Sequence, residues 1–255
     1  MSAAAREPRT VVVTGASAGI GAEVARRLAA DGDRVHLAAR RRDRLEEHVD
    51  AIRAAGGAAF AHACDIADGK STRALFDAVV EQDGRVDAVV NTAAVLWLND
   101  FATLAEADWE AMLATNLGGA IRVTQQALAR MLPRDSGHVV HLTSTAADLG
   151  LPGLAVYSAT KAGVRQLLAA LRGEYGKRGV RFTEIQIGNT ADTEGGGQAL
   201  RPIDPGAIGH ILRWTGAPEM MKPADVAEAV AWALSTPASV RLDRIVMRER
   251  AEIPT

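Results

Sequence analysis

The stretch "TVVVTGASAGIGAEVARRLAADG" at residues 10–32 decides the fold of this chain. Its β-branched start, residues 10–15, predicts a buried strand. From residue 20 the apolar side chains recur at helical spacing, until a glycine ends the pattern at residue 32. The segment "TGASAGIG" at 14–21 therefore joins a strand directly to a helix.

Three glycines in that junction point to a bound phosphate. Gly15 permits a tight turn, Gly19 lets a ligand approach the backbone, and Gly21 lets the helix pack close to the strand. The helix aims its free N–H groups and the positive end of its dipole at whatever lies above the turn. A plain glycine turn is the simpler interpretation, but the position between the first strand and the first helix favours a dinucleotide site.

The rest of the chain alternates between short apolar strands and longer amphipathic helices. Further strands are expected at 34–39, 58–65, 86–91, 138–144, 180–186 and 244–248, and further helices at 43–57, 71–84, 106–131, 155–176 and 224–235. Such alternation builds βαβ units, and hence a parallel sheet that is covered on both faces. We expect one α/β domain over residues 1–255, a Rossmann fold whose doubly wound parallel sheet has about seven strands in the order 3-2-1-4-5-6-7.

The composition excludes several classes of protein. With 48% hydrophobic and 24% charged residues, the 255-residue chain matches an ordinary globular protein. Its net charge of −2 argues against a nucleic-acid partner. The single cysteine, Cys64, excludes an internal disulfide and fits a reducing compartment, and without a His/Cys cluster we expect no metal site. No run reaches the roughly 18 uncharged apolar residues of a membrane span, and no secretory signal is seen, so a cytoplasmic location is expected.

The residues after the second expected strand indicate which dinucleotide is bound. NAD-binding proteins usually place an Asp or Glu there, which binds the 2′-hydroxyl of the adenine ribose. This chain has Ala38 and Ala39 instead, followed by Arg40, Arg41 and Arg42. A guanidinium suits a 2′-phosphate in charge and geometry, so we expect NADP(H), with Arg40 as the main contact. An alternative interpretation for Arg41 and Arg42 is that they are solvent-exposed residues at the start of the next helix.

A second motif, "AVYSATKAG" at 155–163, places Tyr157 and Lys161 four residues apart. That spacing puts both side chains on one face of a helix, where an ammonium favours the phenolate form of a tyrosine. With the glycine turn, this motif resembles the classical short-chain dehydrogenase/reductase family, and the resemblance covers nearly the whole chain. The segments "NTADTE" and "RIVMRER" are more weakly similar to serine-dehydrogenase-like and clavulanate-type members that depend on NADP.

The resemblance implies four catalytic residues. Tyr157 would be the general acid/base, and Lys161 would hold the nicotinamide ribose and lower the pKa of the tyrosine. Ser144, thirteen residues before the tyrosine, would hydrogen-bond the substrate oxygen, and Asn116 would anchor a water in a proton relay. The implied reaction is hydride transfer between NADP(H) and a carbonyl or alcohol substrate, with reduction of a small to medium aldehyde or ketone as the expected activity.

The motifs and the resemblance together also predict the cofactor contacts. These are Gly15, Ser17, Gly19, Ile20, Arg40, Arg41, Asp65, Ile66, Asn91, Ala93, Tyr157, Lys161, Gly188 and Thr190. Among them, Asp65 would approach the adenine and Asn91 would begin the cofactor-contacting loop after the fourth strand. Thr190 and Thr193 are the candidates for the nicotinamide carboxamide.

The chain departs from the family pattern at two places. The family's "NNAG" reads "NTAA" at 91–94, so Thr92 and Ala94 replace an asparagine and a glycine. Thr92 is expected to supply a different hydrogen bond, and Ala94 is strained only if its φ angle is positive. Ile187 replaces a proline before Gly188, and its loss is expected to loosen the loop that follows. Neither change removes a catalytic group.

The substrate side is less specific in the sequence. Trp97, Leu149 and Trp214 are candidate substrate contacts, with a substrate loop at about 188–222, and they indicate a largely apolar pocket. Members of the family commonly form tetramers or dimers through the helices at 106–131 and 155–176, so a homotetramer or homodimer is expected.

Two other functions are weighed against this one. A catalytically silent NADP(H)-binding sensor or assembly protein is possible, but all four candidate catalytic residues are present, which speaks against it. A sugar-nucleotide epimerase or dehydratase of the extended relatives is disfavoured by the short chain and by the three residues between Gly15 and Gly19.

Overall fold

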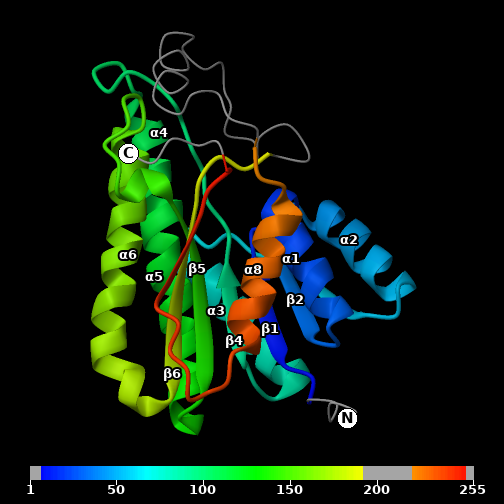
Figure 1. The fold of residues 1–255 in the computed structure, drawn as a ribbon. Coiled ribbons are helices and arrows are strands. Elements are labelled where there is room, and N and C mark those ends of the chain that lie inside the picture. The colour runs from blue at the N-terminus through cyan, green and yellow to red at the C-terminus, as the bar shows by residue number, and fades with distance from the viewer. Residues whose placement is uncertain (1–6, 192–219, 251–255) are drawn as a thin grey trace.

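A parallel seven-stranded sheet is the centre of the molecule, and the computed structural model describes it through residues 7–191 and 220–250 (Figure 1). The strands are β1 (Thr10–Thr14), β2 (Arg34–Ala39), β3 (Ala58–Ala63), β4 (Ala88–Asn91), β5 (Gly137–Ser144), β6 (Val180–Ile187) and β7 (Arg244–Met247). They lie in the order β3-β2-β1-β4-β5-β6-β7, and every neighbouring pair is parallel. The predicted doubly wound sheet and its strand order are confirmed.

Helices cover both faces of this sheet. The described helices are α1 (Gly19–Ala30), α2 (Arg42–Ala54), α3 (Gly69–Asp83), α4 (Glu106–Met112), α5 (Ala120–Met131), α6 (Ala155–Tyr175) and α8 (Pro223–Ser235), with short 3-10 turns η2 (Leu132–Arg134), η3 (Thr145–Ala147) and η4 (Gly176–Arg178). In Figure 1, α1, α2 and α8 lie on one side of the sheet, and α5 and α6 lie on the other. The helices are therefore the two outer layers of a three-layer fold.

The alternation of side chains along β1 explains its unbroken apolar run. Val11 and Val13 belong to the apolar layer that includes Leu28 of α1, whereas Val12 belongs to the layer that includes Leu168 of α6. All three valines are fully buried, because successive strand residues point to opposite faces and a helix covers each face. This burial fixes the strand that leads into the glycine turn.

The long helix expected at residues 106–131 is present, and its middle is π-helical. The α4 helix ends at Met112 and α5 begins at Ala120, and a π-helical stretch, η1 (Leu113–Gly119), lies between them. The side-chain amide of Asn116 pairs with the backbone of Val95 within this stretch, and a β-carbon on Gly119 would lie 2.6 Å from Ile66. The π-helical stretch therefore coincides with close contacts to Val95 and Ile66. Such π-helical turns are frequent at functional sites.

Ion pairs gather at the amino-terminal ends of the strands. Asp83, the last residue of α3, lies 2.6 Å from Arg34 and 2.9 Å from the ring of His36. Arg9, just before β1, lies 2.6 Å from the fully buried Asp33. Burial pushes the pKa of Asp83 up, but the hydrogen bonds from Arg34 and His36 outweigh it and hold that pKa at about 2. These charges tie the strand starts to α3 and to one another.

No helix within residues 7–191 or 220–250 combines the length and the apolarity that crossing a membrane requires.

Candidate functional site

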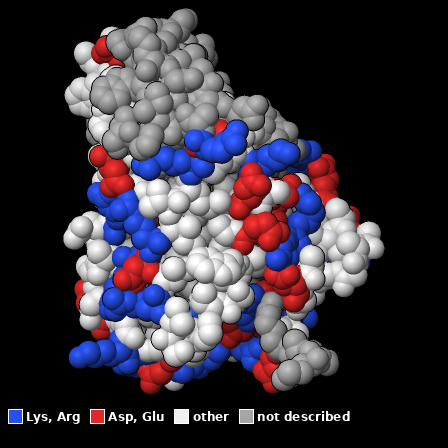
Figure 2. Space-filling view, viewed as in Figure 1, with Lys and Arg blue, Asp and Glu red and all other residues white. Residues whose placement is uncertain are grey.

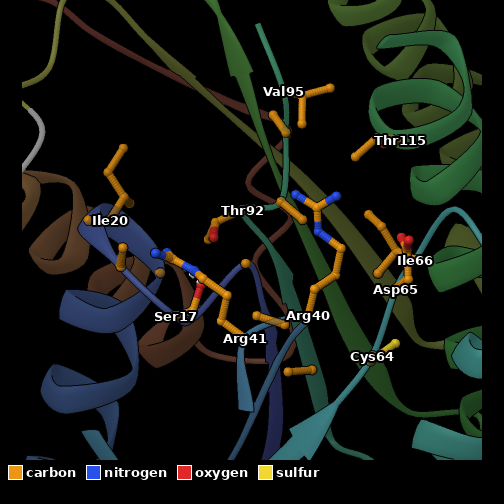
Figure 3. Close-up of a pocket in the computed structure, with 18 of the residues that line it drawn as sticks. Ser17, Ile20, Arg40, Arg41, Cys64, Asp65, Ile66, Thr92, Val95 and Thr115 are labelled. Atoms are coloured by element: carbon orange, nitrogen blue, oxygen red, sulfur yellow. Dashed lines mark hydrogen bonds between the residues drawn. The ribbon is translucent and has the colours of Figure 1, made fainter. Parts of the chain in front are cut away.

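A cavity of about 610 Å³ opens at the carboxyl-terminal ends of β1, β2, β3 and β4 (Figure 3). Its lining residues are Gly15, Ser17, Ala18, Gly19, Ile20, Gly21, Ala38, Ala39, Arg40, Arg41, Cys64, Asp65, Ile66, Thr92, Ala93, Ala94, Val95, Thr115, Thr190 and Ala191. Open α/β sheets bind their ligands in this position, outside the carboxyl ends of the strands. Most of the predicted cofactor contacts line this cavity, whereas Asn91, Tyr157, Lys161 and Gly188 are not among its lining residues.

The glycine turn after β1 has the geometry of a phosphate cradle. Gly15 and Gly19 have positive φ angles of 73° and 54°, which a side chain would make costly. A β-carbon on Gly21 would lie 2.4 Å from the carbonyl oxygen of Gly15, so only glycine lets α1 approach the turn this closely. Ala18, the residue before α1, has no side chain that could cap the first N–H groups of the helix. Those donors suit an anion in the cavity.

The basic residues after β2 divide into two groups. Arg41 Nη2 donates a hydrogen bond to Ser17 Oγ at 3.0 Å, and Arg40 projects into the middle of the pocket (Figure 3). Arg42 instead pairs with Glu46 on the surface, at 2.7 Å. The interpretation of Arg42 as a solvated residue fits this geometry, but Arg41 belongs with Arg40 at the cavity. Two guanidinium groups and a hydroxyl, with no carboxylate among them, suit a ribose 2′-phosphate.

The family departures are accommodated without strain. Thr92 Oγ1 donates to the Thr14 carbonyl at 2.7 Å, which ties β4 to β1. Asp135 is the single described non-glycine residue with a positive φ angle, so Ala94 has a conformation that any residue adopts. Ile187 extends β6 by one residue and pairs with both Ser144 and Met247. The Gly188 N–H then donates to the Met247 carbonyl at 2.8 Å, so the chain is held by the sheet up to this glycine.

Ser144, Tyr157 and Lys161 meet where β5 ends and α6 begins. Ser144 lies close enough to the Tyr157 hydroxyl to act on its pKa. Lys161 lies one helical turn after the tyrosine; its Nζ donates to the Leu142 carbonyl at 3.0 Å and lies 5.6 Å from the centre of the Tyr157 ring. The structure therefore brings three of the four predicted catalytic residues together.

Burial governs the protonation of this group. It raises the pKa of Tyr157 to about 12 against a smaller opposing effect of Ser144, so the expected lowering of this pKa by Lys161 is not seen. It also lowers the pKa of Lys161 to about 8. At neutral pH the tyrosine is therefore a phenol and the lysine is mostly an ammonium. A phenol in this position can donate its proton to an oxygen that gains negative charge.

The two asparagines of the predicted site are both engaged with protein groups. Asn116 accepts from the Val95 N–H and donates to the Val95 carbonyl, each at 2.8 Å, and its role with a water stays a prediction. Asn91 accepts a hydrogen bond from Thr14 Oγ1 and donates to His141 Nδ1 at 3.0 Å, inside the core. Burial lowers the pKa of His141 to about 3, so this ring is neutral. Contact of Asn91 with a cofactor would therefore come from its backbone.

The predicted substrate contacts are only partly placed. Leu149 packs, with Tyr157, against the apolar cluster of Ala146, Leu151 and Leu154. Trp97 is half-buried, and its Nε1 has no hydrogen-bond partner in the described chain. Trp214, Thr193 and most of the 188–222 loop lie outside the described residues.

Several cavity residues were missed by sequence reasoning. They are Ala18, Cys64, Val95, Thr115 and Ala191. Alanine and valine carry no chemical signal in a sequence. Two of these five residues could have been found from the sequence: Cys64, because it directly follows β3, and Thr115, because it is next to Asn116.

Taken together, the sheet, the cradle and the tyrosine–lysine–serine group define a dinucleotide-dependent oxidoreductase. Residues 9–201 match the family model described as short chain dehydrogenase. A glycine betaine reductase, ATRR, of Emericella nidulans is 37% identical over 244 residues, which are 96% of this chain but 19% of that protein. The NADP-dependent 3-hydroxy acid dehydrogenase YdfG of Salmonella typhi is 33% identical, over 93% of each chain.

Among solved structures, the closed form of serine dehydrogenase complexed with NADP⁺ superimposes with a TM-score of 0.82. It is 29% identical, and the match covers 93% of this chain and 94% of that one. The chain belongs to the short-chain dehydrogenase/reductase family. Two findings confirm the predicted cofactor: the pair of Arg40 and Arg41 at the cavity, and the solved structures of relatives that contain NADP. The chain is therefore an NADP(H)-dependent oxidoreductase.

Proposed function

We propose that this enzyme reduces a small to medium aldehyde or ketone with NADPH, and that Tyr157 donates the proton to the substrate oxygen. The observation that carries the proposal is the group of Ser144, Tyr157 and Lys161, in which the Lys161 Nζ lies 5.6 Å from the centre of the tyrosine ring and burial keeps the tyrosine as a phenol. A proton donor suits the reductive direction, because a carbonyl oxygen becomes an alkoxide before it becomes an alcohol.

The described residues fit NADP(H) along one side of the cavity. Gly15, Gly19 and the first N–H groups of α1 would hold the pyrophosphate, and Arg40 and Arg41 with Ser17 would hold the 2′-phosphate. When bound, the nicotinamide supplies the hydride. The protein's own contribution is to bind, to orient and to handle the proton.

Each residue of the catalytic group has a separate task in this proposal. Ser144 donates a hydrogen bond to the substrate oxygen as that oxygen gains charge. Tyr157 transfers its proton to the same oxygen, and Lys161, positive at neutral pH, favours the phenolate that remains. Asn116 holds the start of the loop at Val95 in place beside this group.

An apolar wall beside the tyrosine favours a substrate with an alkyl or aryl portion. Leu96, Leu98 and Leu149 pack, together with Tyr157, against a buried cluster that includes Leu151 and Leu154. Leucines offer no partner for a second charged or polar group on that side, so the apolar part of the substrate would lie against them.

A turnover assay tests this proposal directly. The purified chain is titrated with NADPH by fluorescence, and a panel of aliphatic and aromatic aldehydes and ketones is then assayed with NADPH and NADH in parallel. We expect NADPH binding and NADPH oxidation with at least one carbonyl. Binding without turnover for any carbonyl would favour a silent NADP(H)-binding protein, and failure to bind NADPH would overturn the cofactor assignment as well.

We also propose that the chain forms a homo-oligomer in a cytoplasmic setting. Leu113 and Ile121 are both large apolar side chains that are more than a third exposed, on the outer side of η1 and α5. Light scattering after size exclusion measures the mass, and a monomer at micromolar concentration would contradict this part of the proposal.

A further inference from the structure

A polar cluster lies towards the carboxyl-terminal ends of β5 and β6 and at the start of β7, beside the catalytic group. It consists of Asp148, Arg165, Glu184, Gln186 and Arg244, which we name the Asp148 cluster. Glu184 and Gln186 are 1% and 0% exposed, although both carry strongly polar side chains. Buried polar groups of this kind are usually retained for a reason beyond stability, because apolar side chains would fill the same space at lower cost.

Gln186 binds the residue that we propose to hold the substrate oxygen. Its Nε2 donates to the Ser144 backbone carbonyl at 3.0 Å and to Asp148 Oδ2 at 2.8 Å. Its Oε1 accepts from Arg244. With both donors and the acceptor engaged, the amide has a single orientation. The backbone of Ser144 is therefore fixed from outside its own strand.

Asp148 ends the short turn that begins at Ser144. The Ser144 hydroxyl accepts from the Ala146 N–H at 3.2 Å, and the Asp148 N–H donates to the Thr145 carbonyl at 3.0 Å. The Asp148 carboxylate then accepts from Gln186 and pairs with both Arg165 and Arg244. The turn is thus held at its first residue and at its last.

Arg165 connects this turn to the helix that carries the proton donor. It lies one helical turn after Lys161 and two turns after Tyr157 on α6, so all three side chains lie along one stripe of the helix. Its ion pair with Asp148 ties the Ser144 turn to α6 directly. The distance between Ser144 and Tyr157 is therefore set by a contact outside both residues.

The charges within the cluster balance. Asp148 and Glu184 carry two negative charges, and Arg165 and Arg244 carry two positive charges. Glu184 is also held by Thr143 Oγ1, which donates at 2.5 Å, and by Arg244 at 3.7 Å. A balanced and hydrogen-bonded cluster keeps one arrangement, whereas the loss of a member leaves a buried group without a partner.

We propose that Gln186, with Asp148, Arg165 and Arg244, positions the Ser144 hydroxyl relative to the Tyr157 hydroxyl for catalysis. These are positioning residues, since none of them contacts the proposed cofactor cavity. The proposal rests on the function proposed above. Misplacing a catalytic group by about 1 Å costs up to about a hundredfold in rate, so a cluster that fixes one backbone carbonyl has a measurable effect.

Two variants test the cluster by kinetics. Gln186→Met removes both amide donors at similar size, and Arg165→Met removes the tie to α6 at a position about one-third exposed, where folding is less at risk. For a carbonyl that the wild-type protein reduces, we expect kcat to fall about tenfold in each, with the NADPH dissociation constant unchanged. Arg165→Lys keeps the charge and should recover a large part of kcat.

The matched control is Thr183→Val, in the middle of the same strand and three residues before Gln186, so that the two side chains point to opposite faces of the sheet. Thr183 is fully buried, donates to the Leu242 carbonyl at 2.6 Å and lies 2.8 Å from His138 Nε2. Its loss should lower the melting temperature as much as Gln186→Met does, while kcat stays at the wild-type value. An equal loss of kcat in the control would show that the effect is general destabilisation and would overturn the proposal.

Hydrogen–deuterium exchange provides a readout that needs no turnover. In Gln186→Met and Arg165→Met, we expect faster exchange of the 144–149 amides, with unchanged exchange over 10–40. If the wild-type protein reduces no carbonyl, the proposed function fails, yet the exchange experiment still decides whether the cluster holds the turn. Wild-type exchange at 144–149 in both variants, or wild-type kcat in both, would overturn the positioning role.

Discussion

The two ends of the sheet treat their polar groups differently. At the amino-terminal ends, Asp83 is paired with Arg34 and His36, and Arg9 with Asp33, so each charge has a protein partner. At the carboxyl-terminal ends, Arg40 projects into an open cavity without a partner among the described residues (Figure 3). At the amino-terminal ends the charges are paired within the folded chain, whereas Arg40, directly after β2, is available to a ligand.

The surface around these ends repeats the contrast. In Figure 2, Lys and Arg side chains form a band directly below the grey residues, and Lys, Arg, Asp and Glu are mixed over the rest of the face. Mixed charges stabilise little individually but leave no strong field, while a group of one sign attracts an anionic ligand. The comparison teaches that the paired charges here hold the protein's own groups in place, whereas the unpaired Arg40 is available to a ligand, and substitutions at either end test this difference.

The largest effect is expected at the proton donor. Tyr157→Phe removes one hydroxyl, and kcat for carbonyl reduction should fall about a thousandfold, because the proton then has to come from water. The melting temperature should change little, because the half-buried residue keeps its ring and loses only its hydroxyl. NADPH oxidation under saturating carbonyl measures the change.

The chain contains a matched control for this substitution. Tyr175 is the other of its two tyrosines and ends the same helix at the opposite end of the sheet. Tyr175→Phe should leave kcat unchanged. A wild-type rate in Tyr157→Phe would remove the tyrosine from the mechanism.

The next effect concerns the cofactor. Replacing Arg40 and Arg41 together by Ser should weaken NADPH binding roughly thirtyfold, because two charge-assisted contacts to the 2′-phosphate are lost. NADH lacks that phosphate, so its affinity should stay the same. Fluorescence titration with both cofactors measures the difference.

Arg42→Ser is the control for the arginine pair, since Arg42 is paired with Glu46 on the surface. It should leave both affinities unchanged. A parallel loss of NADPH and NADH affinity in the double variant would mean that the arginines contact something other than the 2′-phosphate.

At the opposite end of the sheet, Asp83→Asn should lower stability and spare catalysis. The loss should be about 2 kcal/mol in the free energy of unfolding at pH 7, from weakened pairing with Arg34 and His36. The folded-state pKa of about 2 lies below the ordinary value of 3.8, so the charged carboxylate stabilises the fold above about pH 4. That contribution disappears as the pH falls towards 2.

Urea unfolding at pH 7 and near pH 2 measures both parts of this prediction. The difference between wild type and Asp83→Asn should shrink at the lower pH. Glu47→Gln, at an exposed pair with Arg44, should have no effect at either pH. A fall in kcat for Asp83→Asn under folded conditions would break the separation between the two ends.

The smallest effect is expected at a family departure inside the cavity. Ala94→Gly restores the residue usual in the family, and because the backbone at Ala94 has no positive φ angle, no strain is relieved. NADPH affinity should change by less than about twofold. A large gain in affinity would show that the methyl group of Ala94 crowds the cofactor.

The sequence predicted the parts of this molecule that depend on local pattern. Local sequence order was enough to interpret the valines of β1, the glycines of the turn and the arginines after β2. The Tyr157 and Lys161 pair was found in the same way, and the structure places Ser144 beside it. The single-domain organisation, the oligomer and the individual residue roles stay predictions.

What could not be predicted depends on distant contacts. The bond from Thr92 to the Thr14 carbonyl requires the register of two strands, and the Asp148 cluster requires three strands and a helix to meet. Arg42 and Arg41 are identical residues in adjacent positions, and only the fold shows that Arg41 turns to Ser17. Pairing on both sides holds Ile187 in the sheet, whereas most of the loop that the loss of proline was expected to loosen lies outside the described residues.

The π-helical stretch between α4 and α5 has a consequence for insertions and deletions. A π turn bonds residue i to i+5, one residue further than an α turn, so removing one residue from 113–119 would let α4 continue into α5 as an ordinary helix. The buried face of α5 would keep its phase against the sheet. Only the π-helical turn that contains Asn116 would be lost. We therefore expect a single residue gained or lost there to displace Asn116 while the fold stays the same.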